Sequence, residues 1–152
     1  MYKVNPEEFL TPHFQLKEFL RSRTAEELGL PNPINPTQKY CLQQLCKLVL
    51  EPLRLYMGEP ILVTSGQRSI ELNQALRGRW NSQHLKGQAA DLHISSHERG
   101  MKMFTYIRDH LDFDQVIFER SKTGSSWLHV SCKQHPEENR HEALPDYHAP
   151  IY

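Results

Sequence analysis

Three side chains of the kinds that bind a catalytic metal lie in two short segments of the chain. His84 and Asp91 belong to segment 82–91, SQHLKGQAAD, and His129 belongs to segment 127–131, WLHVS. Two imidazoles and one carboxylate form the ligand set of a catalytic zinc ion whose fourth position stays open for water. If these side chains converge in space, we expect one Zn²⁺ per chain and a hydrolase.

Other residues could supply the remaining groups of such a site. Bound zinc lowers the pKa of its water towards ~7, so that the zinc-bound water attacks a scissile carbonyl. Glu119 is the candidate to move protons from that water, and Arg68 is the candidate partner of the oxyanion that develops. Ser82 can donate a hydrogen bond to a substrate backbone. His93 either orients a ligand or competes as one.

The candidate residues fall at alternating positions of expected strands. Three segments show period-2 alternation: 88–94, about 114–119 and 127–132. In each one, apolar side chains occupy one face, while Asp91, Glu119 and His129 share the other face. The polar segment 120–126 joins the last two strands and favours an antiparallel hairpin. The pattern predicts a sheet with one apolar face against helices and one functional face.

Helical periodicity supplies the layer that covers the apolar face. Apolar residues recur at i, i+3, i+4 and i+7 between Leu42 and Tyr56. We expect a helix that starts after Asn35, kinks at Pro52 and ends at Gly58.

A second long helix is expected from Ser95 to about Leu111, because Ser95 and Glu98 form a capping-box pattern. Shorter helical signals lie around 15–21, 22–29 and 70–76. Together these elements predict an α+β fold, with helices packed on one face of a small, mainly antiparallel sheet.

Composition limits the alternatives. A length of 152 residues fits a single domain over residues 1–152, in which 133–152 shows no period and is expected to be an irregular tail. The 18 basic and 18 acidic residues balance, which leaves no electrostatic footprint for nucleic acid or an anionic membrane. No apolar run approaches the ~20 residues of a membrane span. We expect a monomer.

The cellular setting can also be predicted. The start, MYKVNP, lacks the apolar stretch of a secretory signal, so we expect synthesis in the cytoplasm. Cys41, Cys46 and Cys132 are odd in number and lack a framework spacing. Buried free thiols and a reducing compartment are therefore expected.

The residues resemble a known family. Segment 82–91 resembles the S-x-H-x-x-G-x-A-x-D motif of the zinc D-alanyl-D-alanine carboxypeptidase family, which includes D-Ala-D-Ala dipeptidases of vancomycin resistance and several phage endolysins. Segment 65–68, SGQR, resembles its substrate-binding S-G-x-R segment, and 127–131 resembles its second ligand motif. The resemblance runs from about Phe14 to Ser131 and implies the hedgehog/D,D-peptidase type of fold.

The resemblance also implies roles for individual residues. By this resemblance, His84, Asp91 and His129 are the zinc ligands, Arg68 binds the substrate carbonyl and Ser82 touches the substrate. Many members carry the catalytic glutamate three residues before the last histidine, where this chain has a serine, Ser126. We expect Glu119, on the adjacent strand, to replace it.

By this resemblance the chain is a zinc metallopeptidase that hydrolyses peptide bonds of peptidoglycan stem peptides. It would suit a phage or prophage lysis protein that acts on the cell wall after release. Carboxypeptidase, dipeptidase and endopeptidase activity all stay open. The alternative is a catalytically silent, zinc-containing module that binds cell-wall peptides or a protein, as the serine at position 126 allows.

Overall fold

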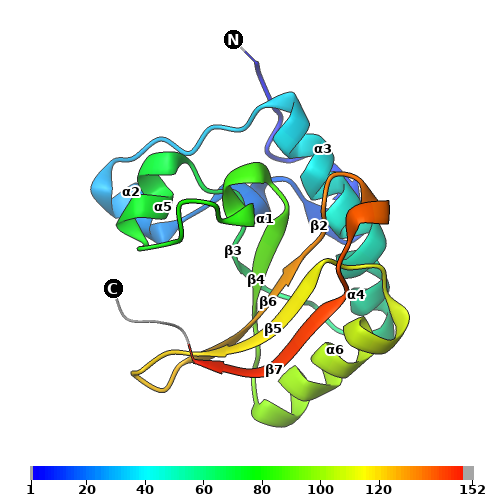
Figure 1. Ribbon diagram of the computed structural model, residues 1–152. Coiled ribbons are helices and arrows are strands. Elements are labelled where there is room, and N and C mark those ends of the chain that lie inside the picture. The colour runs from blue at the N-terminus through cyan, green and yellow to red at the C-terminus, as the bar shows by residue number, and fades with distance from the viewer. Residues whose placement is uncertain (1, 149–152) are drawn as a thin grey trace.

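A five-stranded sheet forms the centre of the molecule. The computed structural model describes residues 2–148, and in it the strands follow the order β3-β4-β6-β5-β7 (Figure 1). Their bounds are β3 Val63–Ser65, β4 Ala89–His93, β5 Gln115–Arg120, β6 Ser126–Ser131 and β7 Glu142–His148. The β5–β7 pair is parallel and the other pairs are antiparallel. The expected α+β class and the mainly antiparallel sheet are confirmed.

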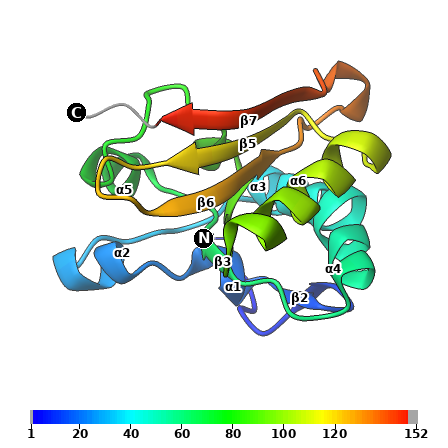
Figure 2. The same cartoon turned by 90° about the horizontal axis from the view of Figure 1, so that it is seen from below.

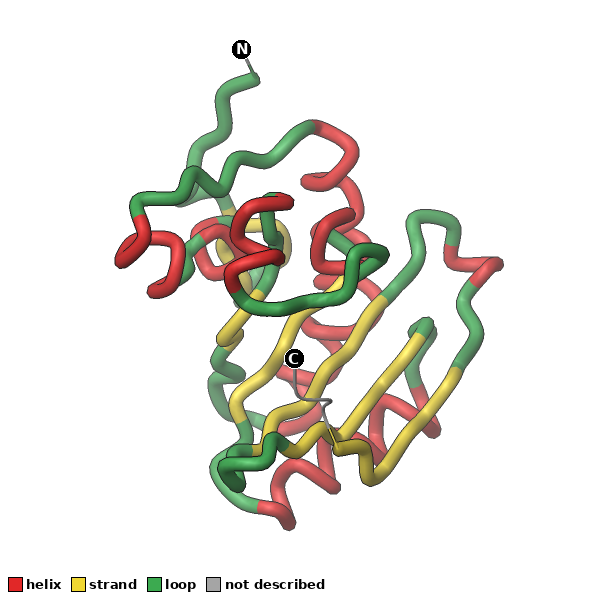
Figure 3. The backbone as a smooth tube through the Cα atoms, turned by 60° about the vertical axis from the view of Figure 1, so that its left-hand side comes forward, coloured by secondary structure: helices red, strands yellow, loops and turns green. Residues whose placement is uncertain are grey.

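The longer helices lie together on one side of the sheet, as Figures 2 and 3 show. They are α3 Pro36–Leu45, the π-helical turn η1 Cys46–Leu50, α4 Glu51–Met57 and α6 His97–His110. The shorter elements are β1 Phe9–Thr11, β2 Phe14–Gln15, α1 Lys17–Leu20, α2 Arg23–Leu28, α5 Ile70–Ala75, and the 3₁₀ turns η2 Gln83–Lys86 and η3 Pro136–Glu138.

Alternation along the strands separates a core face from a functional face, as predicted. Leu92 of β4, Val116 of β5 and Leu128 of β6 lie in the core against the helices. Residues one position away point to the opposite face, where Asp91 pairs with His129 in the strand register. The sheet therefore carries two of the three predicted ligands, Asp91 and His129, on one rigid surface.

The long helix begins and ends where the sequence predicts, and its irregularity precedes the proline. Asn35 and Gln38 form a capping box at the start, and Gly58 ends α4 in the left-handed conformation at φ 70°. The π-helical turn Cys46–Leu50 comes just before Pro52. Since Pro52 lacks an amide proton, the regular hydrogen-bond ladder is interrupted there.

The cap of α6 lies one residue later than expected. Ser96, not Ser95, is the N-cap, and its hydroxyl accepts a hydrogen bond from the backbone N–H of Arg99 at 3.1 Å. Both serines have the right chemistry for a cap. The backbone decides between them, because only Ser96 precedes the first helical residue.

The prediction of an irregular tail at 133–152 is wrong over its described part. The tail contains η3 and then β7, a seven-residue strand that adds to the sheet beside β5. Ala143 of β7 packs against the core, although the segment shows no sequence period. Residues 149–152 of the predicted tail lie outside the described residues.

An ion pair secures the start of this added strand. The Asp114 side chain is fully buried and accepts hydrogen bonds from the backbone N–H, Nε and Nη2 of Arg140 at 2.9, 3.0 and 2.8 Å. The Asp114 carbonyl also accepts the Glu142 N–H at 2.9 Å. A buried carboxylate satisfied in this way fixes where β7 begins, which the polar sequence alone does not reveal.

Two smaller expectations concern the cysteines and the membrane. Cys41, Cys46 and Cys132 are all buried and free, as predicted. Within residues 2–148, none of the helices combines the length and apolar character needed to cross a bilayer.

The Asp114–Arg140 pair predicts a loss of stability in acid. Burial opposes ionisation of Asp114, but the Arg140 hydrogen bonds outweigh it and lower the Asp114 pKa. A lowered pKa gives stability that is complete above the unfolded value of about 3.9 and is lost as pH falls through the folded pKa. We expect the free energy of unfolding in urea to fall more between about pH 6 and about pH 3 for wild type than for Asp114→Asn.

Asp109 provides the matched control. It pairs with Arg108 at 2.8 Å, but both side chains are substantially exposed. Asp109→Asn should leave the pH dependence of the wild-type protein nearly unchanged, because exposed pairs contribute little. Equal pH dependence in wild type and Asp114→Asn would contradict the role given to Asp114.

Candidate metal centre

The three predicted ligands converge on one point of the functional face. One potential ligand atom from each of His84, Asp91 and His129 lies within 4.8 Å of the others. The His129 Nδ1 lies 2.9 Å from Asp91 Oδ1, and the His84 Nε2 lies 3.4 Å from the same oxygen. Ligands at about 2.0–2.1 Å from zinc are at most about 4 Å apart, so these spacings fit a shared ion.

His84 is positioned by a tight turn outside the sheet. It lies in η2, which ends at Gly87 in the left-handed conformation at φ 69°. A Cβ added at Gly87 would meet the Gln38 carbonyl oxygen at 2.4 Å, so a side chain has no room there. The glycine therefore lets the turn press against α3 and carry the imidazole, which is buried, over the sheet.

The orientation of the His84 ring is fixed by the backbone. Its Nδ1 lies 2.7 Å from the carbonyl oxygen of Gly66, and a carbonyl can only accept. The proton is therefore on Nδ1, which leaves the lone pair of Nε2 directed at Asp91. Ligating histidines in metal sites are commonly held in this way.

Asp91 and His129 are placed by strand pairing. They are direct partners across the antiparallel β4–β6 pair, so their side chains leave the same face side by side. A shift by one residue in either strand would turn one of them into the core. Ala89, two residues before Asp91 and on the same face of β4, is small and fully buried.

Arg68 lies against the same carboxylate, within the predicted site. Its Nη2 donates to Asp91 Oδ2 at 3.4 Å, its Nε to Ser65 Oγ at 3.1 Å, and its Nη1 to Asn73 Oδ1 at 3.2 Å. These partners hold the guanidinium beside the candidate metal position. A fixed positive charge there could stabilise an anion that forms on a substrate.

The charges in the cluster shift the protonation equilibria of its members. Burial works against ionised Asp91, yet its charge interactions and hydrogen bonds with His84 and His129 hold the Asp91 pKa well below its usual range. Burial lowers the pKa of His84 and favours the neutral ring that binds metals. Burial also opposes charge on His129, but its bond to Asp91 raises the His129 pKa.

Glu119 of β5 lies on the functional face of the sheet, two residues beyond Ile117, the strand partner of His129. In the β5–β6 register it pairs with Trp127, and its carboxylate forms a hydrogen bond with that side chain. Burial raises the Glu119 pKa, and the charges of His129 and Asp91 act on it. Ser126 pairs with Arg120 and, three residues before His129, points to the opposite face of β6.

Ser82 and His93 lie outside the group of three converging ligands. The Ser82 hydroxyl accepts the His84 N–H at 3.2 Å and caps η2, the turn that contains His84. His93 is exposed and pairs with Trp127. Among residues 2–148, the three-residue group with metal-ligand spacing does not include His93.

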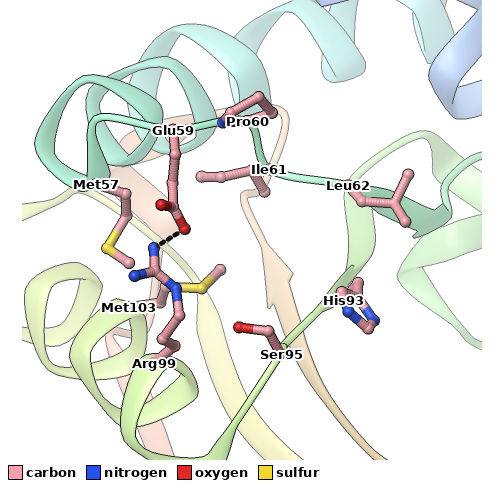
Figure 4. A pocket seen from close by; sticks show the side chains of 9 residues that line it. All are labelled: Met57, Glu59, Pro60, Ile61, Leu62, His93, Ser95, Arg99 and Met103. Atoms are coloured by element: carbon pink, nitrogen blue, oxygen red, sulfur yellow. Dashed lines mark ion pairs between the residues drawn. The ribbon is translucent and has the colours of Figure 1, made fainter.

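A separate cavity lies at the far end of β4, away from the ligands (Figure 4). It is lined by Met57, Glu59, Pro60, Ile61, Leu62, His93, Ser95, Arg99 and Met103. An Arg99–Glu59 ion pair crosses it. This cavity holds no set of metal-binding side chains and does not form part of the metal centre.

Two supporting groups were not foreseen from the sequence. Asn73, buried on α5, accepts from Arg68 and donates to the Arg79 carbonyl at 2.9 Å. A Cβ added at Gly78 would meet Asn73 Oδ1 at 2.0 Å. The only signal for Asn73 in the sequence was a polar residue next to Leu72 in the short helical segment 70–76. The Gly66 carbonyl carries no side-chain signal at all.

Geometry and comparison agree on the class of protein. A buried His-Asp-His set with a neighbouring arginine and glutamate defines a candidate metallohydrolase centre. The family model for peptidase M15 matches residues 12–131. The chain belongs to the peptidase M15 family, a zinc-dependent family of metallopeptidases, and the predicted family resemblance is confirmed. A search of curated proteins found no match.

We expect zinc analysis to give a single ion per chain that depends on His129. His129→Ala removes one of three ligands and leaves Asp91 with fewer partners, so the variant should lose zinc and have a lower Tm. Stripping the wild-type protein with a chelator should lower its Tm in the same direction. The measurements are metal content by plasma emission spectrometry and thermal unfolding.

His93→Ala is the control, because His93 lies on the same strand but outside the ligand group. This variant should keep the wild-type zinc content. Full zinc occupancy in His129→Ala would show that the ion, if bound, lies elsewhere.

Proposed function

We propose that this chain is a zinc peptidase that hydrolyses a peptide bond in peptidoglycan stem peptides. The observation that carries the proposal is the convergence of His84, Asp91 and His129 in a member of the peptidase M15 family. The substrate class follows from the family resemblance. A stem peptide is short and carries a free carboxylate, and a fixed arginine beside the candidate metal position suits such a ligand.

His84, Asp91 and His129 are the residues that would hold the zinc ion. Bound there, zinc would supply an activated water and a Lewis acid for the scissile carbonyl. The protein must provide the groups that move protons and receive charge. The cluster leaves no fourth protein ligand among its members, as a catalytic site requires.

Glu119 is the proposed general base and acid. It shares the face of the ligands, and burial raises its pKa above that of an ordinary glutamate. A carboxylate with a raised pKa accepts a proton more readily and can return it to the leaving amine. Trp127, its partner in the strand register, is a hydrogen-bonding neighbour of the carboxylate.

Arg68 is the proposed partner of the developing oxyanion. Ser65 and Asn73 hold its guanidinium in place, so that little reorganisation is needed when negative charge forms. Ser82 is proposed to contact the substrate backbone from the rim of η2. Its hydroxyl accepts the His84 N–H, which leaves its own proton for another acceptor.

The catalytically silent alternative rests on the serine at position 126. Ser126 points away from the ligands, whereas Glu119 faces them, and this arrangement favours an enzyme. An enzyme of this kind would suit a lysis protein that acts on the cell wall after its release. A silent module would bind the same peptides without cleaving them.

Glu119→Gln should separate the two alternatives. The amide keeps the size of the side chain and its polar contact with Trp127 but cannot accept the proton. We expect the rate of stem-peptide hydrolysis to fall by about 10²–10⁴-fold, with zinc content and Tm retained. The measurement is the release of products from synthetic stem peptides, followed by liquid chromatography and mass spectrometry.

Glu98→Gln is a matched control, since Glu98 lies on α6, on the other side of the sheet (Figure 1). It should hydrolyse the peptides at the wild-type rate. Unchanged turnover in Glu119→Gln would remove Glu119 from the mechanism. A zinc-loaded wild-type protein that binds the peptides but never cleaves them would favour the silent module. The masses of the products identify the bond.

A further inference from the structure

Strand β7 is the strand next to Glu119 at the edge of the sheet that carries the candidate site. It lies beside β5, on the side of Glu119 that faces away from the metal ligands of β4 and β6 (Figure 1). The family match covers residues 12–131, so β7 lies beyond it. Whatever β7 contributes to the site is therefore not supplied by the matched region.

A register shift brings Tyr147 onto the functional face. Ile117 pairs with Leu144, and two residues later Glu119 pairs with Tyr147, three residues further along β7. Without this extra residue Asp146 would oppose Glu119, and two carboxylates would face each other. With it, Asp146 instead accepts from Arg120 Nε at 2.9 Å, and the phenol side chain of Tyr147 lies next to Glu119.

Arg79 reaches Tyr147 from the opposite side of the site. Its Nη2 donates to the Tyr147 hydroxyl at 3.1 Å, from the loop that joins α5 to η2. The carbonyl of Arg79 is held by Asn73, which also holds Arg68. A continuous series of hydrogen bonds thus runs from Asp91, through Arg68, Asn73 and Arg79, to Tyr147.

The direction of the last bond decides what Tyr147 can do. A guanidinium only donates, so the Tyr147 oxygen is the acceptor and its own O–H proton takes no part in that bond. The hydroxyl can donate this proton to another oxygen beside Glu119. A peptide lying along the functional face carries such acceptors, namely backbone carbonyls and a terminal carboxylate.

We infer that Tyr147 is a substrate-binding residue, whose hydroxyl donates a hydrogen bond to a carbonyl or carboxylate oxygen of the peptide on the β7 side of Glu119. Arg79 is its positioning residue. The inference rests on the proposed peptide substrate. It makes β7 a determinant of which peptides bind, because Tyr147 lies on the functional face beside Glu119.

Peptide binding tests the inference independently of cleavage. We compare zinc-loaded Glu119→Gln with the double variant Glu119→Gln/Tyr147→Phe, and measure the Kd for a synthetic stem peptide by calorimetry. Loss of one uncharged hydrogen bond should weaken binding by about 2–12-fold, and loss of a bond to a carboxylate by more. In the cleaving protein, Tyr147→Phe should lower kcat/KM by at least the same factor.

Asp146→Asn is the matched control, since it removes the charge from the neighbouring ion pair between β7 and β5 without touching the functional face. It should leave both Kd and kcat/KM unchanged. An equal loss in Asp146→Asn and Tyr147→Phe, or no loss in Tyr147→Phe, would overturn the inference. So would a wild-type protein that binds no stem peptide.

The outcomes also separate this inference from the proposed function. If the wild-type protein binds stem peptides through Tyr147 but does not cleave them, the peptidase proposal fails and the role of Tyr147 stands. If it cleaves them and Tyr147→Phe is indistinguishable from wild type, only the role of Tyr147 fails. Where Tyr147→Phe does weaken binding, a peptide amidated at its carboxyl end distinguishes the two acceptors: the penalty shrinks if the acceptor is the terminal carboxylate and is unchanged if it is a backbone carbonyl.

Discussion

The buried carboxylate of Asp91 is the constraint around which the site is organised. A charge removed from water must be paired, and Asp91 lies within 3.4 Å of a nitrogen of His84, His129 and Arg68. Each of these three partners comes from a different element, so one carboxylate joins a strand, a turn and a loop. A bound cation would satisfy the same charge and would draw on the same geometry.

The rest of the fold explains why those partners can meet there. The sheet fixes Asp91 against His129 by register, and the helix layer holds the other face of the sheet in the core. Gly87 lets η2 approach α3 closely, which brings His84 over the sheet. Two candidate ligands thus lie on the rigid sheet, while shorter segments supply His84 and Arg68, each held by its own hydrogen bonds.

The loop from α5 to η2 and strand β7 border the candidate site on two sides. The loop from α5 to η2 is anchored by Asn73, and β7 is anchored at its start by the buried pair of Asp114 and Arg140. The bond between Arg79 and Tyr147 joins these borders to each other. Because the anchors are buried polar contacts, the borders keep their places even though they bury little apolar surface.

The amino-acid sequence by itself determined the elements and the chemical character of the site. Period-2 alternation in segments 88–94 and 127–132 placed Asp91 and His129 on one face, since successive strand residues point to opposite sides. Cap residues Asn35 and Gly58 bounded the long helix correctly. Residue types and motif spacing were sufficient to name the candidate ligand set and the family, because both are local properties.

Tertiary structure alone decided how distant segments meet. The tail 133–152 has no hydrophobic period, and its strand forms only because β5 offers an edge and Asp114 a buried anchor. Choosing Ser96 over Ser95 depended on the backbone, and the supporting roles of Asn73 and the Gly66 carbonyl depended on contacts across the chain. Such contacts are set by packing between elements, and a sequence pattern records only the elements themselves.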